Sequence, residues 1–455
     1  MRFSQLDGAA VGVWGAGREI RSLADQLARR LPAARIVVAA FDAPPPDEVR
    51  GALEAGGARL VSGGDAAAAF AECDVVVRSP GVSVHRPELR ALREGGVPVT
   101  TATGLWLGER SGGAVIGVTG TKGKSTTAAL AAHLARAAGF AVHLAGNIGV
   151  PALDLLDRDP QDLAVVELSS YQIADLETGP QVVVITNLFA EHLDWHGGEE
   201  SYREDKLRIL GLPGVETAVL NARSEALTAA AQPSHSDVIA YGVPGGWDVT
   251  ARGIALDGEL ALARAGLPLP GDHNALNLCG ALAALEAYGL PLPPLAESLS
   301  SFHPLPHRLE VIAERGGVLW VDDSISTTPE SALAALASYP DRQIVLIGGG
   351  QDRGQDYVAL ARELARREAA IVGVPSTGPR IVAAARAAGV PAARAIETGE
   401  LESAVALARQ IARPGAAVLL SPAAPSYDHY RDFEERGERF RMLAASGQRP
   451  AGFAG

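Results

Sequence analysis

The chain has 455 residues, of which 47% are hydrophobic, and its formal net charge is −13. This length favours about three domains, and the composition supplies enough apolar side chains to fill their cores. The acidic balance excludes broad binding to nucleic acid or to anionic membranes, which requires a basic surface. No signal peptide and no apolar run of about 20 residues are found. We therefore expect a cytoplasmic protein in which Cys73 and Cys279 are buried free thiols.

Strand-like and helical segments alternate from the N-terminus onward. Apolar runs predict buried parallel strands at Val11–Trp14, Arg35–Phe41 and Asp74–Val77, with helices at Ser22–Arg30 and Pro87–Glu94. This βαβ rhythm predicts right-handed crossovers and an α/β fold with doubly wound sheets.

The alternation restarts twice along the chain. The first restart follows the glycine-rich break at 111–113, and the second, near Val318–Val321, follows the proline-rich segment His303–Pro306. We expect three domains, which are residues 1–108, 109–302 and 303–455. Within the second domain, short apolar runs on either side of Asp257-Gly258 predict a β-hairpin with a type I′ turn.

The strongest local signal is an apolar strand followed by GTKGKST at Gly120–Thr126. A glycine-rich loop that opens a helix can turn backbone N–H groups toward phosphate oxygens, and the helix N-terminus adds partial positive charge. Lys124 can then reach the β- and γ-phosphates of a nucleotide, and the Ser125 hydroxyl can bind Mg²⁺. Val118 occupies the position of the first glycine in the usual spacing, so an ordinary strand–helix turn is the alternative.

The loop Gly15–Arg18, after the first strand, has the glycine content of a dinucleotide-binding turn. Ile20, however, occupies the third glycine position of the dinucleotide pattern. Asp42 follows the second strand, where an acid would bind a ribose, and Ser79–Gly81 follow a later strand. We interpret this region as a nucleotide-binding unit without nicotinamide, the alternative being a purely structural turn.

Polar residues also follow later strands and open later helices. Glu167 ends a buried strand, which delivers a carboxylate to the sheet edge where ligands bind. His192 follows another apolar strand beside two acids, which favours a metal or phosphate role. Lys206 lies in a helical segment, and its spacing alone predicts an ordinary solvated lysine. Asn274 and Asn277 share a helix face and suit an adenine edge or, alternatively, an N-cap followed by an exposed residue.

In this order, these segments resemble the Mur ligase family over essentially the whole chain. The motifs are GTKGKST (120–126), GNIG (146–149), ELSSYQ (167–172), TNLFAEHLDWH (186–196), YREDKLR (202–208), GDHNALN (271–277), LPHRLE (305–310), DDS (322–324) and LLSP (419–422). The block at 421–434 and the short N-terminal domain resemble the glutamate-adding type of this family.

The resemblance implies a Rossmann-like UDP-binding domain, a central P-loop ATPase-like domain and a C-terminal Rossmann-like domain that binds glutamate. It implies an ATP-dependent ligase of peptidoglycan precursor synthesis. Such an enzyme joins glutamate to UDP-N-acetylmuramoyl-L-alanine through an acyl phosphate, with ATP and two Mg²⁺ ions. We also expect a monomer with no nucleic-acid or membrane partner.

The resemblance also implies a role for individual residues. The catalytic residues are Lys124, His192 and Lys206. The metal ligands are Ser125, Glu167, His192 and Lys206, the last of these carbamylated by CO₂. The ATP-binding residues are Gly120, Thr121, Lys122, Gly123, Lys124, Ser125, Thr126, Asn274, Asn277, Arg308 and Asp323. The residues for the UDP substrate are Gly15, Ala16, Gly17, Arg18, Asp42, Ser79, Pro80, Gly81 and Asn147. Those for glutamate are Thr327, Arg353, Ser426 and Phe433.

Several departures resemble the subgroup that adds L-glutamate. Arg353 stands where the glycine-rich glutamate loop usually has lysine, and Ile325 stands where a lysine usually follows Asp323-Ser324. The segments Thr103–Trp106 and Asn187–His196 resemble the same subgroup. Arginine offers a planar fork where lysine offers a point charge, so the exchange is not conservative. We expect L-glutamate, with D-glutamate as the alternative.

Three more distant alternatives share some of these features. A folylpolyglutamate-synthase-like ligase has the same chemistry with another acceptor, but lacks a full UDP-binding domain. A P-loop ATPase or kinase that makes no amide leaves His192, Lys206 and the third domain unexplained. A nicotinamide oxidoreductase is disfavoured by Ile20.

Overall fold

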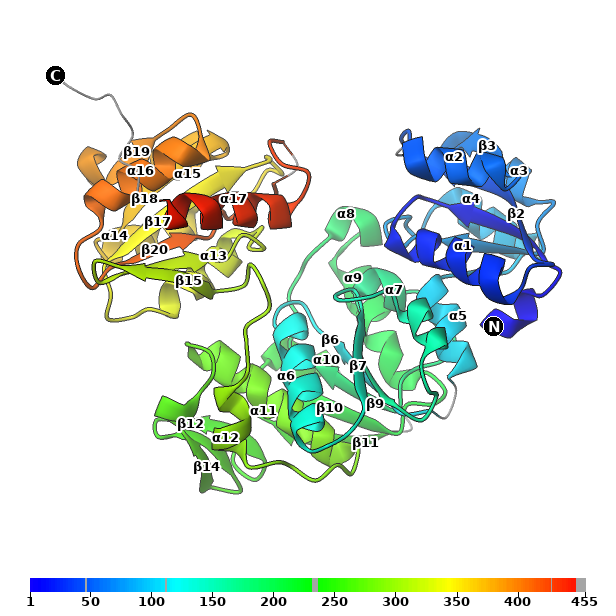
Figure 1. Ribbon diagram of the computed structural model, residues 1–455, viewed down its shortest axis with the longest axis horizontal. Coiled ribbons are helices and arrows are strands. Elements are labelled where there is room, and N and C mark those ends of the chain that lie inside the picture. The colour runs from blue at the N-terminus through cyan, green and yellow to red at the C-terminus, as the bar shows by residue number, and fades with distance from the viewer. Residues whose placement is uncertain (46, 111–112, 231–235, 427, 447–455) are drawn as a thin grey trace. The chain divides into compact units, whose positions relative to one another are not determined.

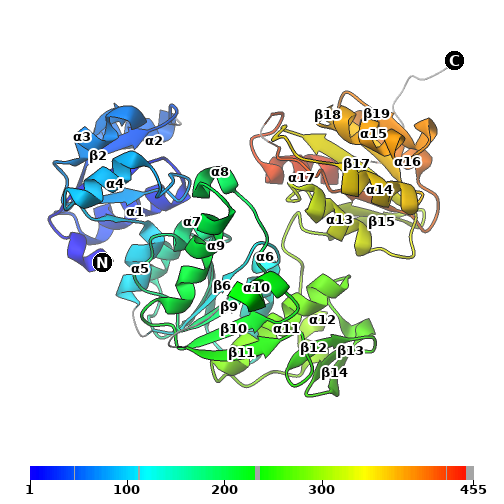
Figure 2. The same cartoon turned by 180° about the vertical axis from the view of Figure 1, so that it is seen from behind.

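The computed structural model describes residues 1–45, 47–110, 113–230, 236–426 and 428–446. It consists of two compact units, residues 1–267 with 274–302, and residues 268–273 with 303–455. Helices lie against largely parallel sheets in both units (Figures 1 and 2). The expected α/β class with parallel sheets is therefore confirmed. The proposed boundaries at 108 and 302 stay predictions, and residues 111–112 of the glycine-rich break lie outside the described residues.

The first sheet is parallel, with the strand order β3-β2-β1-β4-β5. Its strands are β1 (Ala10–Trp14), β2 (Arg35–Phe41), β3 (Arg59–Ser62), β4 (Val75–Arg78) and β5 (Val99–Thr100). Its helices are α1 (Arg18–Arg30), α2 (Asp47–Ala55), α3 (Ala66–Phe70), α4 (Pro87–Glu94) and α5 (Ala102–Glu109).

The two faces of this sheet are covered by different helices. Val11 and Val13 of β1 pack in a core with residues of α1, α2 and α5, whereas Trp14 packs with residues of α3 and α4. After β3 the chain returns to the other side of β1, so β1 and β4 are neighbours. This reversal creates a switch point at their carboxyl ends, where α/β sheets bind ligands.

The first unit also contains a six-stranded parallel sheet, with the order β11-β10-β9-β6-β8-β7. Its strands are β6 (Val115–Thr119), β7 (Val142–Gly146), β8 (Leu163–Glu167), β9 (Val182–Ile185), β10 (Thr217–Asn221) and β11 (Asp237–Tyr241). The helices here are α6 (Lys124–Ala137), α7 (Ser170–Ile173), α8 (Leu193–His196), α9 (Glu199–Leu207), α10 (Glu225–Ala230), α11 (Asp272–Ala287, which spans the unit boundary) and α12 (Leu295–Ser300).

A small antiparallel sheet follows, formed by β12 (Trp247–Thr250), β13 (Gly253–Leu256) and β14 (Glu259–Ala263). The predicted hairpin is confirmed between β13 and β14. Asp257 and Gly258 both have positive φ, 51° and 84°, as a type I′ turn requires.

The second unit contains a mixed sheet of six strands, with the order β15-β16-β20-β17-β18-β19. The strands are β15 (Glu310–Arg315), β16 (Val318–Asp322), β17 (Ile344–Gly350), β18 (Ala370–Ser376), β19 (Ala395–Glu397) and β20 (Ala417–Leu420). The helices α13 (Pro329–Ala337), α14 (Val358–Arg366) and α15 (Gly378–Ala387) share one core, and α16 (Leu401–Ile411) and α17 (Phe433–Ala445) share the other. Only β15 is antiparallel to its neighbour among the described strands of this sheet.

Short 3₁₀ helices complete the described structure, at Phe3–Leu6, Gly63–Asp65, Ala152–Asp157, Arg208–Gly211, Arg264–Gly266 and Ala392–Arg394. Cys73 and Cys279 are buried and free, as predicted. Across the described residues, no helix combines the length and hydropathy needed to span a bilayer.

Candidate active site

The predicted glycine-rich loop lies between β6, which ends at Thr119, and α6, which begins at Lys124. Gly120 and Gly123 have φ of 137° and 86°. A Cβ atom on Gly120 would lie 2.0 Å from Thr186 Oγ1, and one on Gly123 would lie 2.3 Å from Asn277 Oδ1. Both positions therefore require glycine for conformation and for space. The close packing also places the Asn277 amide directly on the loop.

Asn187, which follows β9, holds the middle of this loop. Its Oδ1 accepts hydrogen bonds from the backbone N–H groups of Thr121 at 3.1 Å and Lys122 at 2.8 Å. These two N–H groups are thus directed at Asn187, although the sequence had suggested that the loop amides turn toward a phosphate. The start of α6, with its partial positive charge, is the part of the loop best suited to an anion.

A cavity of about 140 Å³ lies beside the loop. It contains Lys124, Asn147, His192 and Lys206, which the sequence analysis had selected from four separate motifs. The full lining consists of Gly120, Lys124, Asn147, Ser169, Ser170, Tyr171, Glu191, His192, Tyr202 and Lys206. The structure therefore brings the predicted catalytic residues together. Their individual roles stay predictions.

Lys206 is buried, with 2% of its surface exposed, so its interpretation from spacing as a solvated lysine was wrong. Its Nζ donates a hydrogen bond to the Gly120 carbonyl at 2.9 Å. Burial, followed by the positive charge of Lys124, holds the pKa of Lys206 well below its ordinary value. The amine is therefore more often neutral and nucleophilic than a surface lysine.

Glu167 lies at the end of β8 and is 1% exposed. Its Oε1 accepts a hydrogen bond from Asn147 Nδ2 at 2.6 Å. Its Oε2 is enclosed and meets no hydrogen-bond donor among the described residues. Leaving a buried acceptor without a partner costs about 1–3 kcal/mol, and more when it is charged. A bound cation would remove this cost, so the carboxylate fits the Mg²⁺ role that the sequence suggested.

His192 precedes α8 in a left-handed conformation, with φ of 57°. Burial, followed by the charges of Lys122 and Lys124, lowers its pKa, although Glu191 opposes this effect. A neutral imidazole is the form that binds metal ions. Glu191 forms an ion pair of 2.7 Å with Lys122, and its pKa is lowered even though burial opposes its ionisation. The sequence analysis did not select Glu191 itself, although it noted the acids beside His192.

The predicted UDP loops meet at the switch point of the first sheet. A Cβ atom on Gly15 would lie 2.6 Å from Ser79 Cβ, and one on Gly17 would lie 2.9 Å from Ser79 Oγ. The loops after β1 and β4 therefore touch, and their role in binding the UDP substrate stays a prediction. The Arg18 guanidinium donates to the carbonyl oxygens of Asn147 at 2.9 Å and Gly149 at 3.0 Å, which connects the first of these loops to the central sheet.

Asp42 is held by a residue that the sequence analysis missed. Arg86 Nη1 donates to Asp42 Oδ2 at 2.8 Å, and the Arg86 guanidinium lies 4.5 Å from the ring centroid of Trp14. An arginine on an aromatic face is stabilised by the ring quadrupole. Asp42 therefore has a fixed cationic partner beside the loop that follows β1.

In the second unit, Asp323 follows β16 and is buried. It accepts hydrogen bonds from Ser326 Oγ at 2.5 Å, Ser421 Oγ at 2.7 Å and Leu309 N at 3.2 Å. Burial raises its pKa to about 6 in spite of these donors.

The residues predicted for glutamate lie in loops and at a helix start of the second unit. Arg353 is exposed and Ser426 is buried. The Thr327 carbonyl accepts a hydrogen bond from Gln355, and the Phe433 carbonyl accepts one from Ser324. These positions stay predictions.

Arg436 of α17 was missed by the sequence analysis. It is 2% exposed, and burial lowers its pKa to about 10. Its guanidinium donates to Ser324 Oγ at 3.0 Å and to the carbonyl oxygens of Ser324 and Ala424. It therefore ties the DDS segment to the loop that follows β20.

Comparisons with known proteins place the chain in a family. Residues 118–285 match the Mur ligase middle domain, and residues 307–424 match the Mur ligase, glutamate ligase domain. A UDP-N-acetylmuramoyl-L-alanine–L-glutamate ligase of Salinispora tropica is 45% identical over 97% of this chain and 98% of that protein. A protein of the same name from Xanthomonas axonopodis pv. citri is 42% identical over 98% of this chain and 97% of its own length.

The fold agrees with this placement. A UDP-N-acetylmuramate–alanine ligase of Thermotoga maritima superimposes with a TM-score of 0.60 over 96% of this chain and all of that one, at 19% identity. The chain is thus an ATP-dependent ligase that forms an amide bond. It belongs to the Mur ligase family.

Proposed function

We propose that the chain joins L-glutamate to UDP-N-acetylmuramoyl-L-alanine, with release of ADP and phosphate, in the cytoplasmic synthesis of peptidoglycan precursors. The relatives that match nearly the full chain carry the name of this activity. The structural observation that carries the proposal is the cavity that contains Lys124, Asn147, His192 and Lys206. The relatives match nearly the full chain and are named for L-glutamate, so addition of D-glutamate would contradict this proposal.

A carboxylate is a poor acylating agent, because its leaving group would be oxide. Transfer of the γ-phosphoryl group of ATP to the alanyl carboxylate gives an acyl phosphate with a better leaving group. The glutamate amine then attacks the carbonyl carbon, and phosphate departs. Two anions approach each other in the first step, so Lys124 stabilises the charge that develops on the transferred group.

The resemblance implies two Mg²⁺ ions, which would neutralise phosphate charge. We assign Glu167 and Ser125 to one ion. Glu167 offers an oxygen that has no donor among the described residues, and Ser125 lies in the first turn of α6. We assign His192, which lines the cavity, to the other ion, as the family motif implies.

Lys206 completes this set as a carbamate. Its neutral amine attacks the carbon of CO₂ and releases a proton to solvent, which gives a carbamate whose single negative charge is shared by two oxygens. The lowered pKa of the buried amine favours this reaction, because only the unprotonated amine is nucleophilic. The positive charge of Lys124 nearby then stabilises the anionic product.

The family motifs assign the residues that bind the remaining substrates. We propose that Gly15–Arg18, Asp42, Ser79–Gly81 and Asn147 bind the UDP substrate. We propose that Asn274, Asn277, Arg308 and Asp323 hold adenosine, and that Thr327, Arg353, Ser426 and Phe433 hold glutamate. We propose that the protein acts as a monomer, without nucleic-acid or membrane partners.

The test is phosphate release from ATP with UDP-N-acetylmuramoyl-L-alanine and L-glutamate, omitting each substrate in turn. The proposal predicts release only when both are present with Mg²⁺, and a product whose mass has increased by one glutamyl residue. Equal release without the UDP substrate would show that the chain is a simple ATPase under these conditions.

A further inference from the structure

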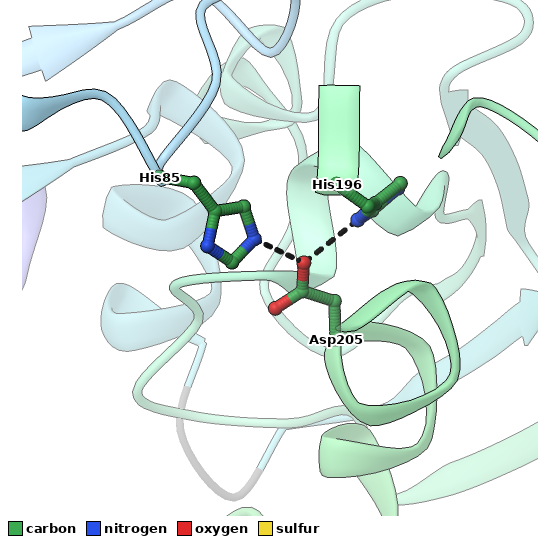
Figure 3. Close-up of side chains that lie close together, drawn as sticks. All are labelled: His85, His196 and Asp205. Atoms are coloured by element: carbon green, nitrogen blue, oxygen red, sulfur yellow. Dashed lines mark hydrogen bonds and ion pairs between the residues drawn. The ribbon is translucent and has the colours of Figure 1, made fainter. Parts of the chain in front are cut away.

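Three side chains from distant segments meet beside α9 (Figure 3). His85 lies in the loop between β4 and α4, His196 ends α8, and Asp205 lies in α9. Asp205 Oδ2 lies 2.8 Å from His85 Nε2 and 2.7 Å from His196 Nδ1. The His196 side chain is fully buried, that of Asp205 is 12% exposed and that of His85 is 38% exposed.

The distances identify this cluster as a hydrogen-bond network. Two imidazoles and a carboxylate can also bind a metal, but ligand atoms around a tetrahedral zinc ion, at about 2.0–2.1 Å from it, lie well over 3 Å apart. Here both ring nitrogens approach one oxygen at 2.7 and 2.8 Å, so each ring donates an N–H to Asp205. His196 Nε2, at 3.0 Å from Ser170 Oγ, is then an acceptor for the serine hydroxyl.

The loop that carries His85 makes further contacts with the helix before α9. Ser83 Oγ donates to the Trp195 carbonyl at 2.6 Å, and Trp195 Nε1 donates to the Gly81 carbonyl at 3.0 Å. Gly81 belongs to the segment proposed above for the UDP substrate. One loop of the first sheet therefore holds α8, which His192 precedes, and α9, which carries Lys206.

Asp205 and Lys206 are consecutive residues of α9, so their side-chain directions are fixed relative to each other by the helix. Holding the Asp205 carboxylate between two imidazoles therefore fixes the rotation of α9 and the direction in which Lys206 leaves it. The Lys206 Nζ donates to the Gly120 carbonyl, and both residues line the cavity. Displacements of about 1 Å in such a site can cost about a hundredfold in rate.

We propose that His85 is a positioning residue, which acts through Asp205 to set the position of Lys206. The loop between β4 and α4, which contains the segment proposed to bind the UDP substrate, thereby determines the geometry of the catalytic centre. This inference rests on the proposed role of Lys206 as a metal ligand. It predicts that loss of His85 impairs the chemical step and Mg²⁺ use rather than binding of the UDP substrate.

The variants are His85→Ala, His85→Gln and, as a matched control, His143→Ala. His143 is likewise partly exposed and has its Nε2 2.8 Å from an aspartate, Asp162, in the central sheet region. We expect His85→Ala to lower kcat about tenfold and to raise the Mg²⁺ concentration for half-maximal rate, with an unchanged KM for the UDP substrate. His85→Gln, which retains a donor, should recover most of the loss. His143→Ala should match wild type.

A double-mutant cycle with Asp205→Ala locates the effect. Phosphate release measured with enzyme in excess keeps slow variants measurable, and thermal unfolding verifies that each variant is folded. If His85 acts through Asp205, His85→Ala lowers the rate in wild type but has no further effect in the Asp205→Ala background. Additive losses would overturn the inference, as would a raised KM with unchanged kcat or a His85→Ala enzyme equal to wild type. Full activity of Lys206→Ala would instead contradict the proposed function.

Discussion

The Lys206 amine donates a hydrogen bond of 2.9 Å to the Gly120 carbonyl, and both residues line the cavity. Gly120 opens the loop before α6, and Lys206 lies in α9, so this contact connects the proposed phosphate-binding loop to the proposed metal ligand. A lysine carbamate retains one N–H. The hydrogen bond to Gly120 can therefore persist when the amine becomes an anion, with the carbamate oxygens free to bind metal.

Substitution of Lys206 tests the carbamate directly. Lys206→Ala should be nearly inactive, since one anionic metal ligand is lost, and a high concentration of acetate should restore part of kcat by supplying carboxylate oxygens. Lys206→Arg should be inactive with or without acetate, because a guanidinium cannot form a carbamate and fills the space. Steady-state phosphate release, measured with and without acetate, gives kcat for each variant. An active Lys206→Arg enzyme would rule out the carbamate.

Lys124→Ala should reduce kcat about a hundredfold or more, the scale for the loss of one preorganised electrostatic stabiliser. Binding of the UDP substrate, measured by calorimetry, should persist, because its proposed residues belong largely to the loops of the first sheet. Lys122→Ala offers a comparison, because the Lys122 ammonium pairs with Glu191. The decrease in kcat should be smaller for Lys122→Ala than for Lys124→Ala. Turnover of Lys124→Ala within a few-fold of wild type would remove Lys124 from the mechanism.

Glu167→Gln should separate activity from stability. The buried Oε2 has no donor among the described residues, so removal of the charge should leave the thermal unfolding temperature unchanged or raise it. We expect kcat to fall about a hundredfold and the requirement for Mg²⁺ to rise. Asp162→Asn, at a partly exposed carboxylate paired with His143, is the control. It should change neither kcat nor the requirement for Mg²⁺. A Glu167→Gln enzyme with normal Mg²⁺ dependence would contradict the metal assignment.

His307 should make the stability of the second unit depend on pH. Its hydrogen bond with Asp322, at 2.7 Å, raises its pKa even though burial opposes this. A raised histidine pKa means that the folded state holds the proton more tightly. The resulting stability is complete below the ordinary value of about 6.5 and is lost as the pH rises through the raised pKa.

His307→Gln should therefore destabilise the protein by about 1 kcal/mol at pH 6, the difference between a charge-assisted and a neutral hydrogen bond. The difference should shrink toward pH 9. Thermal unfolding across this range measures it, with His303→Gln, at an exposed position nearby, as the control. A constant difference between His307→Gln and wild type at all pH values would show that His307 is not protonated in the folded state.

The sequence was informative where function depends on local geometry. Gly120, Gly123 and Lys124 could be recognised because the strand, glycine-rich loop and helix start are contiguous in the chain. The hairpin at Asp257-Gly258 was predictable for the same reason. Likewise, the position of Glu167 at the end of a predicted strand places it at the carboxyl edge of a parallel sheet.

Features that depend on packing between distant segments were not predictable from spacing. Lys206 looks like a surface lysine within its own helix, and its burial arises from the loop and strands around it. His85 and Asp205 are 120 residues apart, and nothing in either local pattern indicates their contact. Arg436 appears as one more charged residue of an amphipathic helix until its guanidinium is seen among buried carbonyl oxygens.

The proposed attachment of L-glutamate is tested most directly by a competition between the two glutamate enantiomers. The enzyme would be given ATP, Mg²⁺, UDP-N-acetylmuramoyl-L-alanine and an equimolar mixture of carbon-13-labelled L-glutamate and unlabelled D-glutamate. The product mass then reports which enantiomer was joined. The wrong enantiomer could not place its amine and both carboxylates on the same partners, so discrimination should be large. We predict almost exclusively labelled product. A predominantly unlabelled product would show that the enzyme adds D-glutamate and would contradict the account.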